Sequence, residues 1–248
     1  MKIVIIGYGN MGREVEKAAL RKNHTIIQKI DPQAQGADAT EITPQTLSGA
    51  DVCIEFTHPD SVVENIKKVV EIGVPIVVGT TKWFDHLKEI ETLIQKKNGS
   101  LLYAPNFSLG MNIFFKICEV TAKIMNRFDD YDIGGMELHH NQKADAPSGT
   151  AKKLSQILID NIDRKKTPVF HLGDRKIQPD ELHFSYLRSG AIPGTHQIVF
   201  DSEPDTITLT HTARSRQGFA SGAITAAEWI VGKKGLFSFD EMMNHLLK

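Results

Sequence analysis

The chain has 248 residues, of which 41% are hydrophobic and 24% charged, the composition of an ordinary globular protein with one or two domains. The 29 basic and 30 acidic residues give a net charge of −1, which argues against nucleic-acid or anionic membrane partners. Cys53 and Cys118 lie in apolar surroundings without metal-ligand spacing, which favours free thiols in a reducing compartment. The start does not read as a secretory signal and no apolar stretch has bilayer-spanning length, so we expect a cytoplasmic protein.

The first half alternates short apolar runs with amphipathic segments of helical length. Such runs are typical of strands buried on both faces. Strands are predicted at 2–6, 24–31, 51–56, 74–81 and 100–106. Helices are predicted at 11–23, 59–73 and 84–97. This alternation predicts βαβ units and a parallel sheet.

The pattern changes after residue 108. Helices are predicted at 111–128, 148–162 and 220–234, a strand at 131–140 and a polar loop at 163–182. The segments LHFSYLR, GTHQIVFDS and DTITLTHTA then alternate apolar with polar residues, which predicts an antiparallel sheet with one covered face. We expect a Rossmann-like dinucleotide-binding domain at 1–108 and 216–248, with an α+β domain inserted at 109–215.

The segment GYGNMG (7–12) matches G-x-G-x-x-G, a weak pattern alone, but here it follows a predicted strand and opens a predicted helix. Gly7 would permit the tight turn, Gly9 the approach of a pyrophosphate, and Gly12 close packing of helix on strand. The helix N-terminus would supply N–H groups and the positive end of the helix dipole. The context favours dinucleotide binding over a simple glycine turn.

Asp31 follows Gly12 by 19 residues and ends the second predicted strand. An acid there would accept hydrogen bonds from the ribose of an adenine dinucleotide. Because a carboxylate would repel a 2′-phosphate, Asp31 favours NADH. Arg13 and Lys29 lie close enough in sequence to leave NADPH open.

The segment HHNQKADAPSGTA (139–151) gathers several reactive side chains. His139 and His140 are adjacent on a predicted strand and point to opposite faces, so they cannot chelate one ion, and we expect no metal. The alternative is that neither residue has a function: His139 would be packed in the interior and Lys143 would be a solvated loop charge.

The end of this segment has the residues of a helix start. Asp145 and Ser148 are cap-type residues, and Gly149 and Thr150 enter the first turn. Free N–H groups there can bind a carboxylate or phosphate, although Ser148 can also cap its helix with nothing bound. With His140 and Lys143 nearby, the pattern predicts a small anionic substrate that receives hydride and a proton, with His139 able to donate near neutral pH.

The segment ELHHNQKADAPSGTA (137–151) resembles the signature of the 4-hydroxy-tetrahydrodipicolinate reductases, also called dihydrodipicolinate reductases, of the diaminopimelate route to lysine. Further segments resemble the family in the same order along essentially the whole chain. They are EFTHPD (55–60), VGTT (78–81), APNFSLG (104–110), RSGAIPGTHQIVF (188–200) and ITLTHTARSRQGFASGA (207–223).

The resemblance implies a role for each matching residue. His139 and Lys143 would be the catalytic acids, and His140, Gly149 and Thr150 would bind the carboxylates of a small dicarboxylate substrate. NADH or NADPH would be held by Gly7, Tyr8, Gly9, Asn10, Met11, Gly12, Asp31, Gly79, Thr80, Thr81, Ala104, Pro105, Asn106 and Phe107. The family is typically a homotetramer assembled through the sheet of the inserted domain, so 109–215 would bind substrate and form the tetramer.

The predicted reaction is NAD(P)H-dependent reduction of 4-hydroxy-tetrahydrodipicolinate to tetrahydrodipicolinate. Two other functions share the first domain: a different two-domain amino-acid dehydrogenase and a non-catalytic NAD(H)-sensing module. Neither of them accounts for the segment 139–151. The division of proton transfer between His139 and Lys143 stays open.

Overall fold

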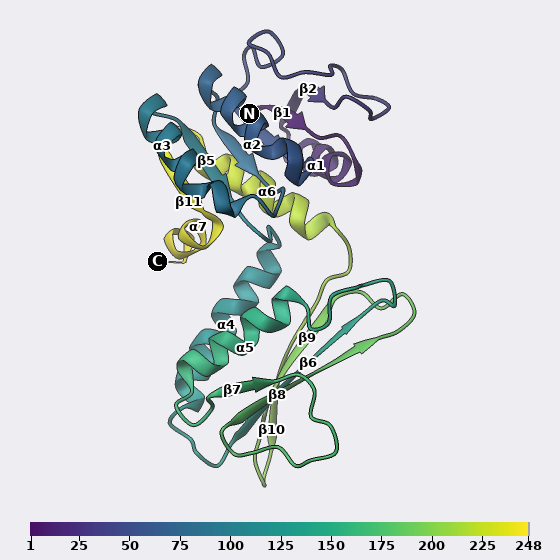
Figure 1. The fold of residues 1–248 in the computed structure, drawn as a ribbon, viewed down its shortest axis with the longest axis vertical. Helices are drawn as coiled ribbons and strands as arrows, with labels where there is room; N and C mark the ends of the chain where they lie inside the picture. The colour runs from purple at the N-terminus through teal and green to yellow at the C-terminus, as the bar shows by residue number, and fades with distance from the viewer. Residues whose placement is uncertain (248) are drawn as a thin grey trace. The chain divides into compact units, whose positions relative to one another are not determined.

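The computed structural model describes residues 1–247, which form two compact units. The first consists of Met1–Leu109 and the chain from Arg216 onward, and the second of Gly110–Ser215. Each unit has its own sheet (Figure 1) and its own hydrophobic core. No helix in residues 1–247 has both the length and the apolar character needed to cross a membrane.

The first unit contains a six-stranded sheet in the order β11-β5-β4-β3-β1-β2. Its strands are β1 (Lys2–Ile6), β2 (Thr25–Ile30), β3 (Val52–Glu55), β4 (Ile76–Val78), β5 (Ser100–Tyr103) and β11 (Gly235–Ser238). Every pairing between them is parallel. The predicted parallel sheet and Rossmann-like fold class are therefore confirmed.

Helices cover both faces of this sheet. They are α1 (Asn10–Arg21), α2 (Pro59–Ile72), the 3-10 turn η1 (Phe84–His86), α3 (Leu87–Lys97), α6 (Gln217–Ile230) and α7 (Phe239–Leu246). Side chains of β1 alternate between the faces: Ile3 and Ile5 pack with α1 and α6, and Val4 and Ile6 pack with α2 and α3. The carboxyl ends of the strands thus lie along one edge, where open α/β sheets bind ligands.

The end of the chain returns to this sheet through elements that the sequence analysis did not predict. Strand β11 pairs with β5, and α7 follows it at once. Ser238 caps α7, and Glu241 returns a hydrogen bond to the Ser238 backbone, forming a capping box. The sequence of β11, GLFS, has only two large apolar residues, so it lacks the continuous apolar run by which the other strands of this sheet were predicted.

The second unit contains a five-stranded sheet in the order β10-β9-β6-β8-β7, with two helices. Its elements are α4 (Leu109–Met125, whose first residue belongs to the first unit), β6 (Asp132–His139), α5 (Gly149–Asn161), β7 (Thr167–Val169), β8 (Glu181–Arg188), β9 (Thr195–Asp201) and β10 (Thr206–Thr212). Residues of α4 and α5 form one core with Ile133, Phe184, Ile198 and Phe200, so one face is covered.

Two predictions for this unit were wrong. The sheet is mixed rather than antiparallel, because β8 runs parallel to β6 and to β7. The crossover through α5 lets the chain return in the same direction, whereas alternation of side chains carries no information on strand direction. The loop predicted at 163–182 contains β7, a three-residue edge strand with Pro168 at its centre.

Candidate active site

A cavity of about 660 Å³ lies at the strand ends of the first unit, lined by Gly9 and Asp31 among other residues. A second cavity of about 390 Å³ shares Gly9, Phe56 and Thr57 with the first. It brings together the predicted cofactor residues Gly9, Asn10, Met11, Gly79, Thr80 and Thr81. Seven of the predicted cofactor residues therefore line two adjoining cavities: Gly9, Asn10, Met11, Asp31, Gly79, Thr80 and Thr81.

Of the three glycines in the loop 7–12, only Gly9 has open space where a Cβ would stand. Gly7 has φ +89°, and a Cβ there would lie 2.1 Å from the backbone oxygen of Phe56. A Cβ at Gly12 would lie 2.2 Å from the oxygen of Gly7. At Gly9, the N-cap of α1, a Cβ would meet no described atom within 4 Å. Gly7 and Gly12 thus serve packing, and Gly9 leaves the approach to the α1 N-terminus open, which fits a bound pyrophosphate.

Asp31 is held by backbone groups at the mouth of the larger cavity. Its Oδ2 accepts from the Tyr8 N–H at 2.8 Å, and its Oδ1 from the Gln33 and Ala34 N–H groups at 2.9 Å. Partial burial raises the pKa of this carboxyl, but the three backbone hydrogen bonds outweigh that effect and lower it. The Tyr8 N–H is thus already engaged. The Tyr8 ring is buried, with the Arg13 guanidinium 4.6 Å from its centre.

The residues predicted near the nicotinamide differ in which of their atoms could contact a ligand. A Cβ at Gly79 would lie 2.0 Å from the Phe56 ring, so any larger residue there would have to displace that ring. The Thr80 hydroxyl accepts from the Thr57 N–H at 2.8 Å. Ala104 and Phe107 have side chains in the core, so only their backbones can face a ligand. Pro105 is exposed and Asn106 is partly exposed.

In the second unit the opening histidine of the motif joins a buried polar cluster around Glu137. Glu137 and His139 lie two residues apart on β6 and share its covered face. Sheet register brings His196 of β9 opposite Glu137, and Arg188 of β8 opposite His139. The cluster therefore draws on three strands and, through Ser148, on the start of α5.

Glu137 is completely buried and both of its carboxylate oxygens accept hydrogen bonds. Oε1 accepts from the Ser148 N–H at 2.9 Å and from Arg188 Nη2 at 2.7 Å. Oε2 accepts from the Ser148 hydroxyl and lies 3.3 Å from His196 Nε2. Burial raises the pKa of Glu137, but the hydrogen bonds from His196, Ser148 and Arg188 outweigh it and hold that pKa far below its usual range. Glu137 is a buried carboxylate.

His139 is 8% exposed, and its Nδ1 lies 3.6 Å from Glu137 Oε2. Burial lowers the pKa of His139 to about 4, reinforced by His196, Lys143 and Arg188 and opposed by Glu137. The imidazole is therefore neutral at pH 7 in this state. Proton donation by His139 near neutral pH therefore requires an added negative charge beside the ring.

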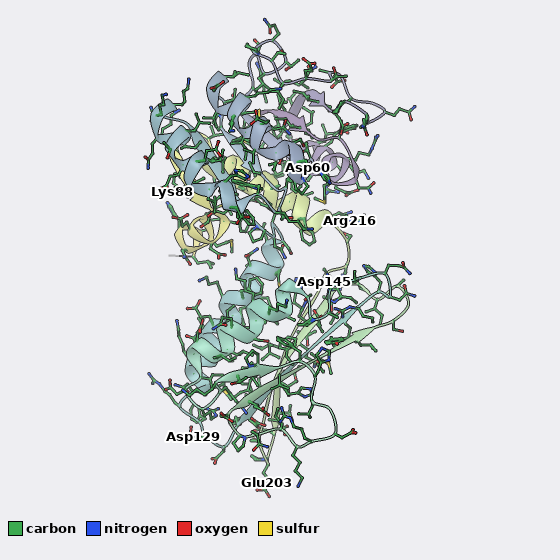
Figure 2. The ribbon with its side chains drawn as sticks, in the orientation of Figure 1. Asp60, Lys88, Asp129, Asp145, Glu203 and Arg216 are labelled. Atoms are coloured by element: carbon green, nitrogen blue, oxygen red, sulfur yellow. The ribbon has the colours of Figure 1, made fainter. Side chains whose placement is uncertain are left out.

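The loop between β6 and α5 carries the remaining predicted residues. Lys143 Nζ lies 2.6 Å from Asp145 Oδ1 (Asp145 is labelled in Figure 2), and His140 is exposed. Ser148 is the N-cap of α5, its hydroxyl accepting from the Ala151 N–H at 3.1 Å. A Cβ at Gly149 would meet no described atom within 4 Å, so this first turn is open to a ligand. The five residues predicted for catalysis and substrate binding thus lie at the end of β6, in the loop that follows it and in the first turn of α5.

Ligand atoms of Glu137, His139 and His196 lie within 4.8 Å of one another, a spacing that a metal ion could use. The Glu137 oxygens, however, already have Arg188 and Ser148 as donors. A divalent ion would have to displace these groups beside a guanidinium charge. We assign no metal to the cluster.

Three members of this cluster have no role in the sequence prediction: Glu137, Arg188 and His196. Glu137 stands two residues before His139, the spacing of one strand face, so a period-two reading of β6 could have paired them. Arg188 and His196 lie in RSGAIPGTHQIVF, a segment recognised only by resemblance. Their approach to Glu137 depends on strand register.

Comparisons with known proteins agree along the whole chain. Residues 1–107 match the family model of the dihydrodipicolinate reductase N-terminus, and residues 110–243 match that of its C-terminus. A 4-hydroxy-tetrahydrodipicolinate reductase of Christiangramia forsetii is 35% identical over 248 residues, covering 100% of both chains. One from Staphylococcus carnosus is 37% identical, covering 98% of this chain and 100% of the relative.

A solved structure shares the fold. The dipicolinate-bound dihydrodipicolinate reductase of Paenisporosarcina has a TM-score of 0.78 at 24% identity, covering 96% of this chain and 97% of that one. The two family models together span nearly all of the sequence, and both curated relatives exceed 30% identity over their full length. The chain therefore belongs to the dihydrodipicolinate reductase family.

Proposed function

We propose that this chain reduces 4-hydroxy-tetrahydrodipicolinate to tetrahydrodipicolinate with NADH or NADPH, in lysine and diaminopimelate biosynthesis. In this reaction the ring loses its 4-hydroxyl as water and gains one hydride and one proton. The observation that supports it most is the second unit's cluster: a buried Glu137–His139 pair beside the capped, open first turn of α5. Such a site suits a small anion that must be protonated.

The cofactor site lies in the first unit. A bound nicotinamide cofactor would supply the hydride. The Gly9 backbone and the α1 N-terminus would hold the pyrophosphate, since Gly9 is the one glycine of the loop with open space where a Cβ would stand. Asp31 would bind the adenosine ribose with its remaining acceptor positions, and Gly79, Thr80 and Thr81 line the smaller cavity where the nicotinamide would bind.

The substrate site lies in the second unit. The N–H groups of Gly149 and Thr150, at the positive end of the α5 dipole, would bind one carboxylate. His140 and Lys143 would bind or orient the other. Lys143 and His139 would share the supply of the proton. In the substrate-free protein Lys143 has Asp145 as its ion-pair partner, so an incoming carboxylate would compete with Asp145.

We also propose that the protein is a cytoplasmic homotetramer. The tetramer is supported by the face of the second sheet that carries no helices. This face exposes the apolar side chains Met136 and Leu187. A shallow cavity of about 330 Å³ lies on the same sheet, lined by Met136, His183 and Val199 among others. Large apolar side chains on a sheet face favour burial against a second copy.

One assay tests the function. The purified chain, given NADH and 4-hydroxy-tetrahydrodipicolinate generated in situ, should oxidise NADH in proportion to substrate supplied. A different amino-acid dehydrogenase would oxidise NADH only with another substrate, and a sensing module would bind NADH without turnover. Either of those results overturns the proposal.

A further inference from the structure

A buried carboxylate of the second unit has no task in the proposed reaction. Glu137 accepts hydrogen bonds from Ser148 and Arg188 and lies 3.3 Å from His196 Nε2, while it is completely buried. A buried carboxylate is costly unless its partners repay the loss of water. Its partners here are the cap of the substrate-binding helix and the neighbours of His139.

One close neighbour of Glu137, His139, is not hydrogen-bonded to it. The Nδ1 atom of His139 is buried and has no hydrogen-bond partner among the described residues, yet it lies 3.6 Å from Glu137 Oε2. A neutral imidazole carries one N–H and can place it on either nitrogen. A protonated imidazole carries both, and its Nδ1–H would then have Glu137 as the nearest acceptor.

The opposite edge of the ring faces a glycine. A Cβ at Gly194 would lie 3.0 Å from His139 Nε2. Any larger residue there would press on the nitrogen that points away from Glu137. The ring is thus placed with Nδ1 toward a carboxylate and Nε2 toward Gly194, where the absence of a Cβ leaves space beside that nitrogen.

We propose that Glu137 is a positioning residue for the reaction, resting on the function proposed above. Its carboxylate accepts the Nδ1–H of His139 when the imidazole is protonated, which leaves Nε2–H to serve the substrate. Through Ser148 the same carboxylate fixes the first turn of α5. Glu137 thus fixes the position of the proton donor His139 relative to the first turn of α5, which would bind the carboxylate.

The charges around His139 explain why a ligand is needed to complete this arrangement. Arg188 and Lys143 disfavour a second positive charge on the ring, and His196 adds to this, while Glu137 alone favours it. A dianionic ligand on the α5 turn would offset Arg188 and Lys143. The balance then shifts toward the imidazolium that Glu137 stabilises.

An amide at position 137 could not replace the carboxylate. Glu137 accepts at both oxygens, whereas a glutamine has one acceptor oxygen and one NH₂ group. The amide nitrogen would face either Arg188 and the Ser148 N–H or the Ser148 hydroxyl and the histidines. It would carry no charge to stabilise the imidazolium in either orientation.

The first test uses the unchanged protein. The proton resonances of His139, assigned by their loss in His139→Gln, are titrated by NMR with NADH alone and with NADH plus dipicolinate as the dicarboxylate probe. The pKa of His139 should rise by at least one unit when dipicolinate is added, with Nδ1 protonated. An unchanged pKa with dipicolinate bound overturns the proposal.

The second test compares Glu137→Gln with Ser148→Ala. Glu137→Gln should lower kcat about 10²–10³-fold, within the range of general-acid catalysis, and should move the alkaline limb of the kcat–pH profile to lower pH. Ser148→Ala keeps the charge, so it should raise KM for the substrate and leave that limb in place. Equal alkaline limbs in both variants would show that Glu137 is merely structural.

The two proposals fail separately. Absence of turnover in the unchanged protein would refute the reductase function. The NMR titration would still report whether a bound dicarboxylate raises the pKa of His139, and it needs no variant of Glu137 to fold.

Discussion

An alanine Cβ at Gly222 of α6 would lie 1.7 Å from the backbone oxygen of Phe107. The obstacle is a carbonyl of the chain rather than a flexible side chain, so the helix can approach this segment only through glycine. Gly222→Ala should therefore lower the free energy of unfolding by about 2 kcal/mol or more, as overpacked cores do.

Gly218 of the same helix is the matched control. A Cβ there would meet its nearest atom, Ser108 Oγ, at 3.6 Å, an ordinary contact. Gly218→Ala should leave stability unchanged or raise it by up to about 1 kcal/mol through helix propensity. Urea unfolding of both variants is the measurement, and equal midpoints would contradict the close approach.

Asp31 should matter for stability as well as for the cofactor. Asp31→Ala removes the acceptor of three backbone N–H groups and should cost about 1–3 kcal/mol in addition to weakening NADH binding. Asp31→Asn keeps an acceptor oxygen at one position and should cost less.

We expect the unchanged protein to bind NADH at least as well as NADPH. A preference for NADPH above about tenfold, roughly 1.4 kcal/mol, would refute the ribose role of Asp31.

His139→Gln and Lys143→Met should each fold and bind NADH, and each should lose turnover by about 10²–10⁴-fold. Because both would serve one substrate, the double variant should lose less than the product of the single losses. Steady-state kinetics, NADH titration and thermal unfolding on the three variants test this. Near-normal kcat in both single variants, with folding intact, would remove the catalytic assignment.

The pKa of His139 also predicts how stability changes with acid. Its folded pKa of about 4 lies below the ordinary 6.5, so the unfolded chain binds more protons between these values. Stability from this group is therefore present above about pH 6.5 and is lost as the pH falls toward 4. His139→Gln should flatten the dependence of the urea midpoint between neutral pH and about pH 5. The pKa of Glu137 is lowered from its usual value, so its contribution to stability is lost at a more acidic pH than that of His139. The two contributions can therefore be measured separately.

The proposed tetramer predicts a contrast between two exposed leucines. Leu187 of β8 lies on the sheet face without helices and is 50% exposed, while Leu20 of α1 in the first unit is 56% exposed. Leu187→Asp should shift the mass measured by light scattering from tetramer toward smaller species, because it buries a charge in the proposed contact. Leu20→Asp should leave the mass unchanged. Loss of the tetramer in both, or in neither, would count against this face.

Local patterns were enough to predict the first unit apart from β11 and α7. The run of β1, the glycine loop and the start of α1 are contiguous, so each element is specified by its own residues. Likewise α2 begins with Pro59 and ends at Gly73, whose φ is +92°. The direction of β8 and the pairing of Glu137 with Arg188, 51 residues apart, depend on register between distant strands. Those features, and with them the partners of His139, could not be derived from side-chain alternation.

The return of the chain to its first sheet has a consequence for biosynthesis. Ala223 and Ala227 of α6 share a core with Ile3 and Ile5 of β1, and β11 completes the sheet edge beside β5. The ribosome therefore synthesises the contiguous second unit before it makes the residues that complete the first. Until α6 emerges, the sheet face that carries α1 is only partly covered, which leaves the nascent chain dependent on late residues to bury its apolar side chains. A protein shortened ahead of Gln217 would keep every glycine of the phosphate loop and still lack the helix that seals the core behind it.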